Sequence, residues 1–167
     1  HGFGGISVIR ISGPDSKNII RKISSVNKNK NQIIHQAVTL LKLFDSDGLP
    51  FEESIITFFK KPHSYTGEDV IEISCHGNPS IVNKVLSLCC ASGARMADPG
   101  EFTKRAFENG RLDLSQVEGL SELIDAETSV QLDQAQRIFD GSLGKIVADW
   151  RSEIIDCKAL IEVSIDF

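Results

Sequence analysis

Short alternating runs of hydrophobic and polar residues, rich in β-branched side chains, recur through the first 110 residues and are typical of half-buried β-strands. These runs predict strands over residues 6–11, 37–44, 54–59 and 70–75. The turn residues at 45–48 separate the second and third runs and predict an antiparallel hairpin. Residues 94–97 predict a short fifth strand. The pattern therefore indicates a mixed sheet of about five strands.

Helix signals lie between these runs. Pro14 marks the start of a short helix that we expect to end near Ile23, before a polar loop at 24–32. Asn78, followed by a proline, has the N-cap and first-turn chemistry of a second helix, and Gly93 follows its end. The first part of the chain therefore combines a sheet with helices in an α+β arrangement.

A third helix is predicted between Asp98 and Gly110. Asp98 and Glu101 have the spacing of a capping box, in which Asp98 would be the N-cap residue and Glu101 would occupy the first turn. Gly110 is placed where a helix commonly stops. We therefore expect this helix to close the α+β part of the chain.

From residue 115 onward the periodicity is purely helical. Two further capping boxes are predicted, Ser115 with Glu118 and Thr128 with Gln131. A hydrophobic stripe follows at spacings of three and four and requires a helical partner. The stripe consists of Leu143, Val147, Trp150, Ile154, Cys157 and Ile161. We expect two antiparallel helices of this chain, or the remaining helices of a bundle, to cover it.

The predicted fold class is α+β, followed by part of an all-α helical bundle. We expect a first domain over 1–110 and the first helices of a second domain over 111–167. Because the chain starts at His1 and stops within a helical pattern, we expect both natural ends, with any targeting segment, to lie outside it.

Composition supports a globular protein. The 167 residues include 41% hydrophobic and 25% charged residues, and no apolar run approaches the roughly 20 residues of a membrane-spanning helix. Residues 1–110 carry 13 Lys and Arg against 11 Asp and Glu, whereas residues 111–167 carry 5 against 12. An acidic C-terminal third is a poor surface for phosphate backbones, so an autonomous RNA-binding protein is the least favoured class.

The cysteines and histidines indicate neither a disulfide framework nor a metal site. Cys75, Cys89, Cys90 and Cys157 contain no C-x-x-C motif, and we expect buried, reduced thiols in a reducing compartment. The histidines at 1, 35, 63 and 76 lack metal-ligand spacing. Cys75 and His76 are adjacent in a strand, where neighbouring side chains point apart, so a thiol–imidazole pair is not expected.

The candidate chemistry is concentrated on two strands. No G-x-x-x-x-G-K-[ST] phosphate loop is present, so this chain is not expected to bind a nucleoside triphosphate through such a loop. The hydroxyls and acids of residues 63–69 indicate either catalysis or a hydrogen-bonded turn. Glu72 and Arg10 each stand in a strand of otherwise apolar or small residues, and each either faces solvent or contacts a ligand. Placed on neighbouring strands, they would suit a small ligand with an amidine-like edge and anionic groups.

Several motifs together resemble the MnmE family of tRNA modification GTPases, also called TrmE. They occur in family order and cover essentially the whole chain. The motifs are Gly4-Gly5-Ile6, Arg10-Ile11-Ser12-Gly13, Ser64-Tyr65-Thr66-Gly67-Glu68-Asp69, Cys75-His76-Gly77, Pro99-Gly100-Glu101-Phe102-Thr103-Lys104-Arg105-Ala106-Phe107, Leu112-Asp113-Leu114 and Ile165-Asp166-Phe167.

The resemblance implies a folate-binding and homodimerising N-terminal domain, followed by the start of a central helical domain. It implies that Arg10, Glu72 and Arg111 bind 5-formyl-tetrahydrofolate or 5,10-methylene-tetrahydrofolate. No catalytic residue and no metal ligand carry over to this chain. The full-length protein would be a GTP hydrolase, using GTP, Mg and K through a GTPase domain that this chain lacks.

The family modifies carbon 5 of the wobble uridine of certain tRNAs with an FAD-dependent partner, MnmG. The resemblance therefore implies tRNA and MnmG as partners, no membrane, and a cytoplasmic or organellar setting. The sequence departs from the family pattern at Phe3, Asn78 and Asp98. Two alternatives stay open: a purely structural dimerisation and docking module without folate binding, and a free-standing folate-dependent enzyme resembling the aminomethyltransferases.

Overall fold

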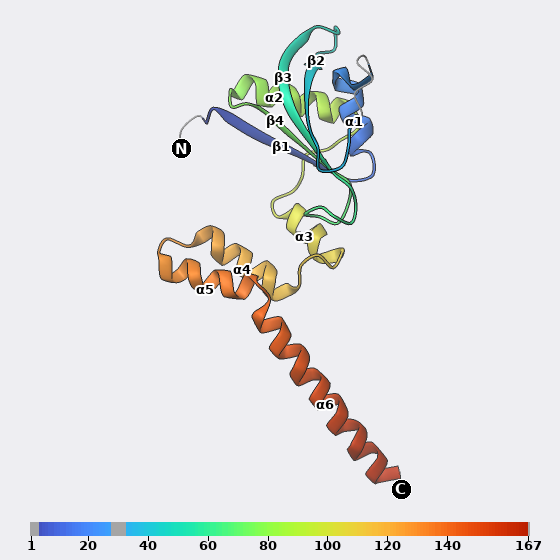
Figure 1. Cartoon of the computed structure of the whole chain (residues 1–167), viewed down its shortest axis with the longest axis vertical. Helices are drawn as coiled ribbons and strands as arrows, with labels where there is room; N and C mark the ends of the chain where they lie inside the picture. The colour runs from blue at the N-terminus through green and yellow to red at the C-terminus, as the bar shows by residue number, and fades with distance from the viewer. Residues whose placement is uncertain (1–3, 28–32, 167) are drawn as a thin grey trace. The chain divides into compact units, whose positions relative to one another are not determined.

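The computed structural model describes residues 4–27 and 33–166, and Phe3 lies outside them. The chain divides into two compact units, His1–Arg111 and Leu112–Phe167 (Figure 1). The first unit contains a sheet and three α-helices and the second contains three α-helices, which confirms the predicted α+β class followed by helices. No helix within the described ranges has the length and apolar character needed to cross a membrane.

The sheet has four antiparallel strands rather than the mixed five predicted. The strands are β1 (Ile6–Ser12), β2 (Val38–Phe44), β3 (Pro50–Phe59) and β4 (Val70–His76), in the order β1-β4-β3-β2 (Figure 1). The predicted hairpin between β2 and β3 is confirmed. Residues 94–97 form no strand, so that prediction was wrong. The Arg95 guanidinium donates to the Met96 carbonyl and to Glu101, which ties this segment to the next helix rather than to β1.

Helices α1 (Ser16–Ile23) and α2 (Pro79–Ala91) cover one face of the sheet. Strand alternation turns one set of side chains toward these helices, and burial of that apolar surface is the main stabilising contribution to this unit. The core includes Ile11, Ile20, Leu43, Phe58, Ile73 and Val85. Helix α1 begins two residues later than expected, and a short 3-10 helix, η1 (Ser25–Asn27), follows it.

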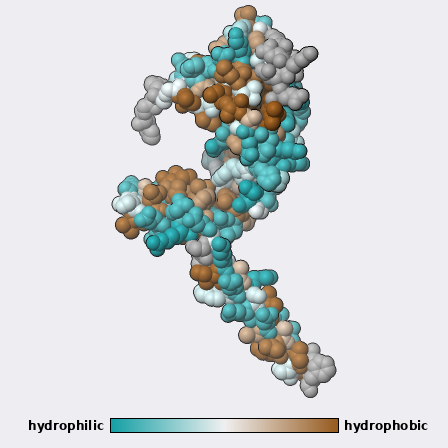
Figure 2. Space-filling view, viewed as in Figure 1, coloured by the Kyte–Doolittle hydropathy of each residue, from teal (hydrophilic) through white to brown (hydrophobic). Residues whose placement is uncertain are grey.

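The opposite face of the sheet carries hydrophobic residues that none of the described elements of this unit covers. Figure 2 shows hydrophobic side chains at the surface over the strands. Strand alternation and register place five exposed apolar residues on this face, which we call the open sheet face. They are Ile6, Val8, Val38, Leu40 and Ile55, with exposed fractions between 42% and 71%. An apolar patch of this kind on a folded domain is typical of an interaction surface.

The predicted helix caps are partly confirmed. The Asn78 side chain accepts a hydrogen bond from the Ser80 backbone N–H at 2.8 Å, as expected of the N-cap of α2. Asp98 is not the N-cap of α3 (Glu101–Glu108), because Gly100, with φ of +76°, occupies that position. One of the two hydrogen bonds of the expected capping box is present, because the Glu101 carboxylate accepts from the Asp98 backbone N–H at 2.9 Å.

The second unit consists of α4 (Leu114–Asp125), α5 (Ser129–Phe139) and α6 (Ser142–Asp166). The predicted capping box at Thr128 is confirmed, but α4 is capped by Asp113 with Gln116 rather than by Ser115 with Glu118. Helices α4 and α5 pack closely at Gly119, where a Cβ atom would lie 2.7 Å from the Phe139 backbone nitrogen.

The α6 stripe has no cover within the described part of the second unit. The exposed fractions of Val147, Trp150, Ile154 and Ile161 all exceed half, and Cys157 is exposed as well. The expectation that two helices of this chain cover the stripe is therefore not met, while the side chain of Leu143 lies outside the described residues.

Candidate functional site

Arg10 and Glu72 form an ion pair across two neighbouring strands. The antiparallel register places Arg10 of β1 directly opposite Glu72 of β4. Arg10 Nε donates to Glu72 Oε1 at 2.7 Å, and the exposed fractions of the two side chains are 55% and 28%. Both residues alternate with core residues of their strands, so both side chains lie on the open sheet face.

This pair retains unused hydrogen-bonding capacity. Among the described residues Arg10 makes only the Nε bond, which leaves its two terminal nitrogens as donors. Glu72 likewise keeps its second carboxylate oxygen as an acceptor. An adjacent guanidinium and carboxylate can therefore bind both an acceptor and a donor edge of one ligand through charge-assisted hydrogen bonds.

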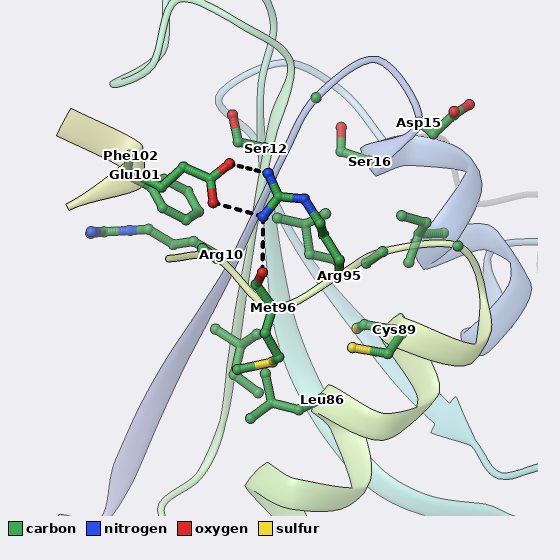
Figure 3. A pocket seen from close by; sticks show the side chains of 18 of the residues that line it. Arg10, Ser12, Asp15, Ser16, Leu86, Cys89, Arg95, Met96, Glu101 and Phe102 are labelled. Atoms are coloured by element: carbon green, nitrogen blue, oxygen red, sulfur yellow. Dashed lines mark hydrogen bonds and ion pairs between the residues drawn. The ribbon is translucent and has the colours of Figure 1, made fainter. Parts of the chain in front are cut away.

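A pocket of about 560 Å³ lies along the outer edge of β1 and reaches Arg10 (Figure 3). Its apolar lining includes Val8, Leu86 and Met96, and Figure 3 shows Leu86 and Cys89 of α2 on the wall across from Phe102 of α3. The lining also contains charged side chains, among them Arg10, Arg95 and Glu101, and a concave volume of this size with apolar walls and convergent polar groups is typical of small-molecule sites.

Ser16 supplies a polar group in the lining of this pocket that needs a partner. The residue is 1% exposed, and its hydroxyl has no hydrogen-bond partner in the described part of the chain. A buried hydroxyl without a partner costs free energy, so a ligand that satisfies it gains affinity.

Three arginine and glutamate contacts form one network beside the pocket. The Glu101 carboxylate accepts from Arg95 and from Arg105 at distances between 2.5 and 3.1 Å, and Arg105 also donates to Glu68 at 2.8 Å. The Arg95 hydrogen bond, followed by the Asp98 N–H and Arg105, lowers the pKa of Glu101 from 4.5 to about 2. The network therefore joins α3 both to the segment before it and to the loop at 64–69.

Substituting Glu101 with Gln is expected to lower stability at neutral pH and to flatten its acid dependence. Because the folded-state pKa is depressed, the contribution of Glu101 is fully present above about pH 4.5 and is lost as the pH falls from there toward 2. Thermal unfolding midpoints of the two proteins between pH 2 and 7 check this. Parallel curves over the acid range would contradict it, and Glu53→Gln, at an exposed acid on β3, serves as the matched control.

The hydroxyl-rich residues at 64–69 form a hydrogen-bonded turn. The Ser64 hydroxyl donates to the Glu68 carbonyl, and the Thr66 hydroxyl lies 2.7 Å from that of Ser12. Ser12 also donates to the Glu68 carboxylate at 2.7 Å. These bonds attach the turn to the end of β1, two residues after Arg10.

Arg111 does not contact the Arg10–Glu72 pair. Its side chain is exposed and has no polar partner within the described ranges, while its backbone N–H donates to the Ala106 carbonyl at 2.8 Å. The side chain lies instead against Gly67. The structure therefore brings two of the three predicted site residues together and places the third beside the turn that leads into β4.

The cysteines and His76 do not form a nucleophilic pair. The Cys75 thiol is buried, which raises its pKa, and it lies 3.7 Å from the Ser7 carbonyl oxygen. The His76 ring instead lies 2.8 Å from the nearly buried Glu52 carboxylate. The prediction of buried thiols is confirmed for Cys75 and Cys89 but was wrong for Cys157, which is exposed, and Cys90 is only half-buried. Within the described ranges no three His, Cys, Asp or Glu side chains are grouped to hold a metal ion.

The sequence patterns indicated no site role for five residues that line the pocket, namely Arg95, Met96, Glu101, Phe102 and Arg105. One signal was present, since Glu101 and Arg105 are four apart and face the same side of a helix. The other contacts join segments far apart in the chain, such as Glu68 and Arg105, and leave no local pattern.

Two family models together match nearly the whole chain. The model described as GTP-binding protein TrmE N-terminus matches residues 1–111, and the MnmE helical domain matches residues 114–167. The tRNA modification GTPase MnmE of Ruegeria sp. (strain TM1040) is 44% identical over 99% of this chain. The proteins of the same name from Roseobacter denitrificans and Lactiplantibacillus plantarum are 47% and 42% identical, each over 99% of this chain. The matched region covers 38%, 38% and 36% of these three relatives, so the chain spans somewhat more than a third of their length.

Proposed function

Because the chain belongs to the MnmE family of tRNA modification GTPases, also called TrmE, we propose that it forms the folate-binding and dimerising part of such a protein. The ligand would be 5-formyl-tetrahydrofolate or 5,10-methylene-tetrahydrofolate, which supplies a one-carbon unit. The residues of this chain bind and orient that folate, and no catalytic residue is assigned among them.

The observation that carries this proposal is the Arg10–Glu72 pair beside the pocket. The pterin of a folate has an amino group next to a ring N–H, and this donor edge suits the free oxygen of Glu72. The terminal nitrogens of Arg10 suit the acceptor groups of the same ligand. Arg111 would meet acceptors elsewhere on the folate. The pocket at Arg10 has apolar walls for the ring systems, and the Ser16 hydroxyl in its lining lacks a partner.

The open sheet face supports homodimerisation. Its five apolar residues are exposed in a single chain, and packing two such faces together about a two-fold axis would remove them from water. Glu72 and Arg10 lie on the same face, so the second copy would also lower the dielectric constant around the folate site.

In the whole protein we place this unit in the modification of tRNA at carbon 5 of the wobble uridine. GTP hydrolysis, with Mg and K, belongs to a GTPase domain outside these residues, and the FAD-dependent MnmG is the proposed protein partner. A protein that acts on tRNA works where tRNA is present, so the proposed compartment is the cytoplasm.

Calorimetric titration with 5-formyl-tetrahydrofolate, combined with analytical ultracentrifugation, tests the proposal. We expect saturable binding of the folate to a dimer. In the Arg10→Ala variant the dissociation constant should rise, because charge-assisted hydrogen bonds are lost. A folded dimer that does not bind folate would instead support a structural dimerisation and docking module, the alternative that the open sheet face by itself favours.

A further inference from the structure

The stem of Arg111 lies against Gly67, where an added side chain would crowd it. Gly67 has φ of +76°, and a Cβ atom built there would lie 3.2 Å from Arg111 Cγ and 3.0 Å from Asn109 Cβ. These contacts are tighter than ordinary van der Waals distances. The stem of Arg111 therefore packs directly on the backbone of the turn at Gly67.

Asn109 fixes the same segment to the same turn by a hydrogen bond. Its side-chain amide donates to the Thr66 carbonyl at 2.8 Å. Thr66 is fully buried, and its hydroxyl contacts Ser12 at the end of β1. Thr66 and Gly67 therefore connect the position of Arg111 to β1, the strand of Arg10. The same turn leads into β4, the strand of Glu72.

We propose that the turn at 64–68 sets the position of Arg111 relative to Arg10 and Glu72, with Gly67 and Asn109 as positioning residues. This inference rests on the proposed folate function. Neither residue needs to touch the ligand. Each acts through Arg111, whose side chain has no polar partner in the described structure.

The test is a double-mutant cycle on the whole protein, with the dissociation constant of 5-formyl-tetrahydrofolate measured by calorimetry. In the wild-type background, Asn109→Ala and Gly67→Ala are each expected to weaken binding by about three- to tenfold, the usual range for one hydrogen bond or contact. In the Arg111→Ala background, neither substitution should weaken binding further, because the residue through which they act is absent.

The matched control is Gly48→Ala, in the hairpin turn between β2 and β3. Gly48 has φ of +75°, nearly that of Gly67, but a Cβ atom there would meet nothing within 4 Å. Both substitutions therefore strain the backbone alike, and only Gly67→Ala crowds Arg111. Gly48→Ala should lower the unfolding temperature without changing the folate dissociation constant. If the Gly67→Ala protein does not fold, the comparison of Asn109→Ala in the wild-type and Arg111→Ala backgrounds is sufficient to test the inference.

Two results would overturn the inference: equal loss of affinity in both backgrounds, which indicates a general effect on the fold, or an Arg111→Ala variant that binds folate as tightly as the wild type. These results can be distinguished from failure of the proposed function, in which the wild-type protein itself would bind no folate.

Discussion

Replacing Glu72 with Ala is expected to weaken 5-formyl-tetrahydrofolate binding by about ten- to a hundredfold, or roughly 1.5 to 3 kcal/mol. The substitution removes the carboxylate that would accept from the pterin donor edge and also frees the Arg10 Nε donor. Because the Glu72 side chain lies on the open sheet face rather than in the core, the fold should persist. Calorimetric titration of both proteins at the same ionic strength measures the difference.

Two matched variants make this prediction specific. Glu72→Gln keeps the size and one acceptor oxygen but loses the charge, so its affinity should fall between those of the wild type and Glu72→Ala. Glu122→Ala removes an exposed carboxylate on α4, in the second unit and outside the open sheet face, and should leave folate affinity unchanged. An unaltered dissociation constant in a folded Glu72→Ala protein would refute the assignment of Glu72.

Introducing a charge on the open sheet face is expected to convert the dimer into a monomer. Leu40 of β2 is 57% exposed and belongs to this face, so Leu40→Asp would bury an unpaired carboxylate at the interface. In a two-fold symmetric dimer the substitution occurs twice, and we expect the dimer dissociation constant to rise at least about a hundredfold. Sedimentation velocity over a concentration series measures this change.

The control for this experiment is Leu49→Asp. Leu49 is 62% exposed but lies outside the open sheet face, in the turn between β2 and β3. The two variants add the same charge to equally apolar positions. A Leu40→Asp protein that sediments as a dimer like the wild type would show that the second copy binds elsewhere, and would remove the support that the open sheet face gives to homodimerisation.

Local patterns predicted most of the secondary structure because the relevant physics is local. Alternation with β-branched residues identified all four strands, and Asn78 before a proline identified the start of α2. The predictions failed where two local signals compete. Gly100 takes the N-cap position that the spacing assigned to Asp98, and Asp113 caps α4 in place of Ser115.

The site was less predictable, because its contacts depend on which strands and loops become neighbours. A charged residue in each of two apolar strands singled out Glu72 and Arg10, but only the sheet order places them opposite one another. Ser12 and Glu68 are separated by 56 positions and Arg105 and Glu68 by 37. These long-range pairs leave no periodic signal, and within the charge network only the pair of Glu101 and Arg105, four residues apart, leaves one.

The sheet order has a consequence for how the site is lost. Glu72 is on an interior strand, whereas Arg10 is on β1, which pairs among the described strands with β4 alone. Detaching an edge strand needs fewer broken hydrogen bonds than unfolding the domain, so transient opening of β1 would separate the two charges while β2, β3 and β4 stay paired. A ligand that bridges the two strands must oppose this opening. Amide protons of β1 should therefore exchange with deuterium more slowly as folate is added, while those at the centre of the sheet change little.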